Sequence, residues 1–187
     1  MITMCGRNYA FDAELWLPRA PEELFAFFSD AHNLQLITPA FLRFHVLTPR
    51  PIVMHAGTLI EYRLKVRGVP IRWLTKITEW EPPHRFVDEQ LRGPYRLWRH
   101  EHSFTEHDGV TRIRDHVEFR SRGGPVAPIL HRLFVNHDVE SIFPYRARVL
   151  LERFGKTWPV STGCMDLVYQ VPGSTSQGRH LEPDQSR

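Results

Sequence analysis

The fold is decided by residues 59–67, which read Leu59-Ile60-Glu61-Tyr62-Arg63-Leu64-Lys65-Val66-Arg67. Apolar and charged side chains alternate at every second position, a pattern typical of a β-strand with one face buried and the other in water. The alternation returns in the segments that follow, between Gly68-Val69-Pro70, Pro82-Pro83, Gly93-Pro94 and Asp108-Gly109. Short strands separated by such turn-forming residues predict an antiparallel meander over residues 57–119, in which each strand pairs with the next.

The elements outside the meander complete an α+β pattern. Short helices are predicted to begin at Pro21 and, after Asp30, over residues 31–36, because proline suits a first helical turn and aspartate suits an N-cap. Residues 129–154 place apolar side chains at steps of three and four, which predicts one long amphipathic helix. About seven strands are expected, over residues 8–17, 42–47, 59–67, 71–77, 86–91, 95–105 and 111–119. One apolar sheet face needs a cover, and the long C-terminal helix is the element available for it.

Length and composition predict one ordinary domain. We expect an N-terminal extension over residues 1–7, a domain over residues 8–154, and a polar, largely disordered tail over residues 155–187. No signal peptide or membrane-spanning segment is evident, and Cys5 and Cys164 form no disulfide framework, so a cytoplasmic location is expected. The net charge of +3 comes with arginines on the polar phase of the strands. We interpret them as a solvated sheet face, with no nucleic-acid partner.

Several segments resemble a known family: residues 20–34, 37–39, 57–62, 80–90 and 93–104, which include Trp80-Glu81-Pro82-Pro83-His84-Arg85-Phe86. Their order is similar to the helix-grip, START-like superfamily, and within it to the bacterial SRPBCC proteins of the polyketide cyclase/dehydrase type. The resemblance covers about residues 8–154. It implies a curved antiparallel sheet wrapped around the C-terminal helix. It also implies a cavity for a small or medium hydrophobic ligand such as a lipid, an isoprenoid or quinone, or an aromatic polyketide. No cofactor is implied.

Polar residues on the inward phase of neighbouring strands are candidates for chemistry. His100 and His102 share a phase with Trp98 and Phe104, and Asp115 on the next strand also faces inward. Three interpretations stay open. The histidines orient a ligand or bond to Asp115, they exchange protons with a substrate, or they bind a metal. His-x-His presents two imidazoles on one face, but no firm third ligand is evident, so no metal site is predicted.

The predicted ligand-binding residues lie on the inward phase of the strands and on the apolar stripe of the last helix. They are Tyr62, Leu64, Trp73, Thr75, Phe86, Asp88, Gln90, Trp98, His100, His102, Phe104, Asp115, Val117, Leu133, His137 and Tyr145. Glu79 is a further inward candidate.

The main functional hypothesis is binding, with or without transport, of a hydrophobic molecule in this cavity. The first alternative is a cofactor-free cyclase or dehydratase that uses His100, His102 and Asp115 as acid–base groups. The second is a partner-binding module whose bulky side chains fill the core. The sequence leaves the ligand and the oligomeric state open.

Overall fold

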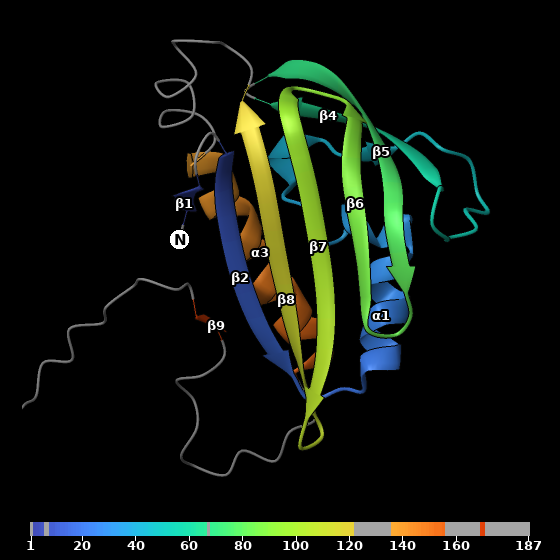
Figure 1. The fold of residues 1–187 in the computed structure, drawn as a ribbon, viewed down its shortest axis with the longest axis vertical. Coiled ribbons are helices and arrows are strands. Elements are labelled where there is room, and N and C mark those ends of the chain that lie inside the picture. Colours follow the sequence, from blue (N-terminus) through green and yellow to red (C-terminus); the bar gives the residue numbers. More distant parts are fainter. Residues whose placement is uncertain (1, 6–7, 67, 122–135, 156–168, 171–187) are drawn as a thin grey trace, which may run out of the picture.

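The computed structural model is built on one antiparallel sheet with helices on one of its faces (Figure 1). The backbone is described for residues 2–5, 8–66, 68–121, 136–155 and 169–170, and side chains for residues 8–66, 68–121 and 141–155. The sheet runs in the order β1-β2-β8-β7-β6-β5-β4-β3, and β9 pairs with β2. Strands that follow each other along the chain from β3 to β8 are neighbours, as the predicted meander requires.

The strands are β1 (Ile2–Cys5), β2 (Asn8–Leu17), β3 (His45–Val46), β4 (Leu59–Val66), β5 (Val69–Glu81), β6 (Arg85–Arg92), β7 (Tyr95–His107), β8 (Val110–Ser121) and β9 (Tyr169–Gln170). The helices are α1 (Pro21–Ser29), the 3-10 turns η1 (Ala31–Gln35) and η2 (Ala40–Leu42), and α3 (Asn136–Phe154). In the view of Figure 1, α1 and α3 both lie behind the sheet. No helix in the described part of the chain is long and apolar enough to cross a membrane.

Local sequence signals explain the turns and helix starts. Asp108 and Gly109 both have positive φ, at 51° and 79°, as a tight two-residue hairpin turn between β7 and β8 requires. Pro21 occupies the first turn of α1, and the side chain of Asp30 accepts a hydrogen bond from the backbone N–H of His32 at the start of η1. The α+β helix-grip prediction is therefore confirmed.

The ends of the sheet differ from the prediction. The predicted strand over residues 42–47 is reduced to His45–Val46, because η2 occupies Ala40–Leu42 and Arg43 follows it with a left-handed φ of 44°. Within the predicted extension, Ile2–Cys5 form a strand along β2, and within the predicted tail Tyr169–Gln170 pair with β2 as well. The rest of the tail after Gly155 lies outside the described residues.

The prediction that Glu79 faces inward is wrong, because β5 contains a β-bulge. The register shifts between Ile77 and Glu79, so the side chains beyond Ile77 exchange faces. Glu79 consequently forms ion pairs with Arg85 and Arg99 on the outer face, while Trp80 packs into the core.

The buried face of α3 is rotated from the predicted stripe. Phe143, Ala147, Leu150 and Phe154 are buried against the sheet and α1, and Arg146 is buried among them. Tyr145, which the prediction placed on the stripe, is only half-buried and stacks against Arg148. The part of the predicted helix over residues 129–135, with Leu133, lies outside the described residues, and so does the side chain of His137.

On the outer face, Asp12 joins β2 to β8. One of its carboxylate oxygens accepts hydrogen bonds from Arg114 Nη2 at 2.7 Å and from His116 Nδ1 at 2.8 Å. Partial burial acts to raise the pKa of Asp12, but the contacts with His116 and Arg114 outweigh it and hold the pKa below its usual value. A carboxylate with a lowered pKa stabilises the folded state above its unfolded pKa and loses that contribution in acid.

We therefore predict that Asp12→Asn lowers the free energy of unfolding by about 0.5–1 kcal/mol near neutral pH. The difference from the wild type should shrink as pH falls below about 4, the usual pKa of an aspartate in the unfolded chain, and disappear below the lowered pKa of the folded protein. Urea unfolding at several pH values measures both. Glu106→Gln is the control, because Glu106 is exposed and forms no ion pair with another described residue. A loss in the free energy of unfolding of Asp12→Asn that stays constant down to acid pH would contradict this prediction.

Candidate functional site

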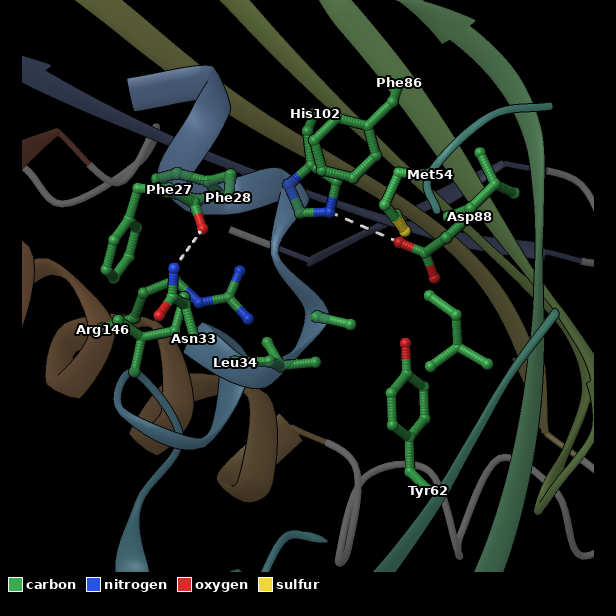
Figure 2. A pocket seen from close by; sticks show the side chains of 14 residues that line it. Phe27, Phe28, Asn33, Leu34, Met54, Tyr62, Phe86, Asp88, His102 and Arg146 are labelled. Carbon is green, nitrogen blue, oxygen red and sulfur yellow. Dashed lines mark hydrogen bonds and ion pairs between the residues drawn. The ribbon is translucent and has the colours of Figure 1, made fainter. Parts of the chain in front are cut away.

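A cavity of about 50 Å³ lies between the sheet, the α1–η1 segment and α3. Its walls are mostly apolar, with polar groups at its edges. The lining residues are Phe27, Phe28, Ala31, Asn33, Leu34, Ile37, Met54, Ile60, Tyr62, Ile77, Phe86, Asp88, His102 and Arg146. Figure 2 shows Asp88 and His102 together on one side, with the hydroxyl of Tyr62 and the guanidinium of Arg146 pointing into the cavity from others.

A second cavity of about 10 Å³ also has Arg146 in its wall. It is bounded by β2, β8 and α3, through Ala13, Glu14, Leu15, Ile113, Asp115, Phe143, Arg146, Ala147 and Leu150. Arg146 is thus common to the walls of both cavities.

Cross-strand register brings two carboxylates and two imidazoles together. His102 on β7 is the direct partner of Asp115 on β8, and His100 is the direct partner of Asp88 on β6. Side chains of direct partners in adjacent strands project to the same face, close together. All four side chains therefore meet on the inner face of the sheet.

Each imidazole lies between the two carboxylates. His100 forms a hydrogen bond of 3.0 Å through Nε2 with Asp115 Oδ1, and its Nδ1 lies 3.8 Å from Asp88 Oδ2. His102 turns the opposite way, with Nδ1 2.7 Å from Asp115 Oδ1 and Nε2 3.3 Å from Asp88 Oδ2. The 2.7 Å contact is close but lies off the line that a hydrogen bond requires. The ring of His102 also stacks on Phe86, with 4.3 Å between ring centres.

Arg146 on α3 supplies the remaining charge. Its Nη1 lies 3.6 Å from Asp115 Oδ2, and its guanidinium lies over the ring of Phe143. The side chain is only 7% exposed, yet Nε and Nη1 have no hydrogen-bond partner in the described part of the chain. A buried donor without a partner is costly, and more so when it is charged.

The pKa values of the cluster diverge because of these contacts. Burial lowers the pKa of His100, and the charge of His102 lowers it further. Burial also acts to lower the pKa of His102, but the carboxylates of Asp115 and Asp88 outweigh it and raise the pKa above its usual value. Burial acts to raise the pKa of Asp115, but His102, His100 and Arg146 together hold it well below its usual value.

Tyr62 shares this environment. Burial raises the pKa of its hydroxyl, and the charge of Asp88 raises it further, so the hydroxyl keeps its proton. It remains available in the cavity as a hydrogen-bond donor.

Some of the predicted ligand-binding residues line these cavities. Tyr62, Phe86, Asp88 and His102 line the larger cavity, and Asp115 lines the smaller one. His100 lies directly behind, against both carboxylates. Contacts of two others are local: Gln90 bonds to the backbone carbonyl of Tyr95, and Trp73 packs against Trp98 in an aromatic cluster. Among the predicted residues whose side chains the structure describes, those that do not line either cavity are Leu64, Trp73, Thr75, Gln90, Trp98, His100, Phe104, Val117 and Tyr145.

The wall formed by α1 and η1 was not predicted, nor was Arg146. The apolar residues of α1 were recognised, but their direction depends on how the helix packs on the sheet. Arg146 had a usable signal, because it lies three residues after Phe143 and four before Leu150, on one face of a helix.

Three of these residues could hold a metal ion. Asp88, His100 and His102 each offer a ligand atom, and these atoms all lie within 4.8 Å of one another. Asp88 thus lies where a third ligand atom would be needed beside the two histidines.

The cluster predicts strong coupling between Asp115 and Arg146. Asp115→Asn should lower the free energy of unfolding by about 3–5 kcal/mol, because it leaves buried cations unbalanced. The double variant Asp115→Asn/Arg146→Met should lose less than the sum of the single variants, by about 0.5–3 kcal/mol. Urea unfolding of the four proteins measures this. Additive losses would show that the two side chains do not interact.

Comparison with known proteins agrees with this architecture. Residues 17–141 of the 187 match the family of polyketide cyclases/dehydrases and lipid transport proteins. Among solved structures, the Zhui aromatase/cyclase from Streptomyces sp. R1128 is similar with a TM-score of 0.64 and 14% identity, covering 83% of this chain and 99% of that one.

Two further structures show the same fold. The protein TTHA0849 from Thermus thermophilus is similar with a TM-score of 0.59 and 20% identity, over 76% of this chain and 98% of that one. Ms6760 from Mycobacterium smegmatis is similar with a TM-score of 0.59 and 16% identity, over 82% of this chain and 98% of that one. No curated protein sequence matches. With the family match spanning most of the sheet, the chain belongs to the polyketide cyclase/dehydrase and lipid transport family.

Proposed function

We propose that this protein binds a small or medium apolar molecule with an oxygen-containing polar end, in the cavity between the sheet, α1 and α3. The apolar part would contact the aromatic and aliphatic walls. The polar end would be held by Arg146, with Tyr62 and His102 beside it. Lipids with an acidic head and aromatic polyketides both have this chemistry.

The observation that supports the proposal best is the state of Arg146. Its charged side chain is buried at the boundary of both cavities, and two of its nitrogens lack hydrogen-bond partners among the described residues. A carboxylate, phosphate or carbonyl oxygen in the cavity would satisfy these donors, and hydrogen bonds to a charged group contribute about 1.5–3 kcal/mol each. Asp115 lies 3.6 Å from the guanidinium and forms an ion pair with it.

The cavity must widen when an organic ligand enters. Its volume of about 50 Å³ is well below the ~300–1,000 Å³ usual for ligand pockets. Two lining side chains are suited to move. Met54 is flexible and lies in a segment without regular secondary structure, and Arg146 separates the larger cavity from the smaller one. Rotation of Arg146 toward a ligand would join the two cavities.

The enzymatic alternative uses the same side chains. A cyclase or dehydratase would need His100, His102 and Asp115 to exchange protons with a substrate in the cavity. The contacts among these three side chains suit proton exchange. The donors of Arg146 that lack a partner among the described residues favour binding, because they could hold a ligand oxygen without any reaction. The resemblance in fold to an aromatase/cyclase at 14% identity does not transfer its activity.

We predict that Arg146→Met weakens binding of the anionic apolar dye anilinonaphthalene sulfonate by about 10- to 100-fold, the equivalent of one charged hydrogen bond. Dodecanoate should displace the dye from the wild type more effectively than dodecanol, and this preference should disappear in Arg146→Met. Dye fluorescence measures both the affinity for the dye and its displacement. The buffer contains a chelator for metal ions. Arg148→Met is the matched control, because Arg148 lies on the same helix, is exposed and pairs with Glu152.

Two results would contradict the proposal. Equal affinity of the wild type and Arg146→Met would show that Arg146 does not hold the polar end. A wild type that binds neither the dye nor dodecanoate would favour a filled core that serves as an interaction module.

A further inference from the structure

The cluster of Asp88, His100 and His102 has the geometry of a metal site. We propose that these three side chains bind a divalent transition-metal ion such as zinc or ferrous iron, with a fourth coordination position open to the larger cavity. This inference goes beyond the binding of an apolar molecule, and it stands on the arrangement of the side chains alone.

The distances between the ligand atoms fit one ion. Around tetrahedral zinc, with bonds of about 2.0–2.2 Å to nitrogen and oxygen, neighbouring ligand atoms are separated by roughly 3.4 Å. Asp88 Oδ2 lies 3.3 Å from His102 Nε2 and 3.8 Å from His100 Nδ1. All three residues offer atoms within 4.8 Å of one another. The 3.8 Å separation is too long for a hydrogen bond, so a metal would bridge these groups better than direct contact does.

The outer contacts of the two histidines provide a second observation. Metal-binding histidines usually direct their other ring nitrogen to a carboxylate or carbonyl, which fixes the ring. Here both remaining nitrogens, His100 Nε2 and His102 Nδ1, contact the same oxygen of Asp115, at 3.0 Å and 2.7 Å. The hydrogen bond of His100 and the close contact of His102 place both imidazoles against one buried carboxylate, with their other nitrogens toward Asp88.

The charges suit a divalent ion with an anionic fourth ligand. The charge of Asp115, which contacts both imidazoles, is balanced by that of Arg146. Asp88 neutralises one of the two positive charges of the ion, which leaves one for a ligand that enters from the cavity. Two histidines and one carboxylate are the ligand set of open zinc and non-haem iron sites. Since Asp88 and His102 also line the cavity, the open position faces it. That position would accept a water, hydroxide, carboxylate or carbonyl oxygen.

Titration of the chelator-treated full chain with Co²⁺ tests the proposal. The wild type should develop the visible absorption of cobalt in a nitrogen and oxygen site, saturate at one ion per chain, and lose the absorption when Zn²⁺ is added. Asp88→Asn should abolish the saturable spectrum. It is the most informative variant, because Asp88 is less buried than the histidines and asparagine keeps its shape. Asp115→Asn should weaken binding by about 10- to 100-fold, as loss of an orienting carboxylate does.

His116→Gln is the matched control. His116 lies on β8 on the outer face, also beside a carboxylate, that of Asp12. This variant should bind cobalt as the wild type does. Circular dichroism confirms that each variant is folded. Absence of a one-to-one spectrum in the wild type, or an Asp88→Asn protein that binds like the wild type, would overturn the metal site. Because no organic ligand is used, neither result depends on the function proposed above.

Discussion

The buried carboxylate of Asp115 joins three elements of the fold in the protein interior. An ionised group in an apolar interior is stable only with partners, and Asp115 obtains them from β7, through His100 and His102, and from α3, through Arg146. One side chain thus links β7, β8 and α3 in the interior. The apolar clusters on either side position the same elements, but their packing alone would tolerate small shifts that this cluster would not.

The sequence predicted the sheet side of the site well and the helix side poorly. Period-two alternation placed His100, His102, Asp115 and Asp88 on one face, since side chains in a strand leave little choice of direction. The bulge after Ile77 reversed the phase of Glu79, and no residue in that segment indicates a bulge in the sequence. Arg146 was missed because a charged residue in a helix usually faces water, and only its partner on β8, far away in the sequence, makes burial possible.

Burying these charged side chains costs more free energy than filling the same part of the core with apolar side chains would. Replacing buried charges with apolar side chains of similar volume often leaves stability unchanged or raises it. Five ionisable side chains that meet at the wall of a cavity are therefore better explained by what they bind than by what they stabilise. A single geometry serves both proposals: Arg146 offers donors to an oxygen, and the imidazoles with Asp88 offer a metal that would hold the same oxygen.

Native mass spectrometry of the gently purified protein, with an organic extract of the same sample analysed in parallel, shows whether the cavity holds a ligand. Our account predicts one organic molecule per chain, released into the extract and carrying an acidic or carbonyl oxygen group, and its loss from Arg146→Met but not from Arg148→Met. A wild-type chain that carries no organic mass, and gains none when incubated with excess dodecanoate, would contradict it.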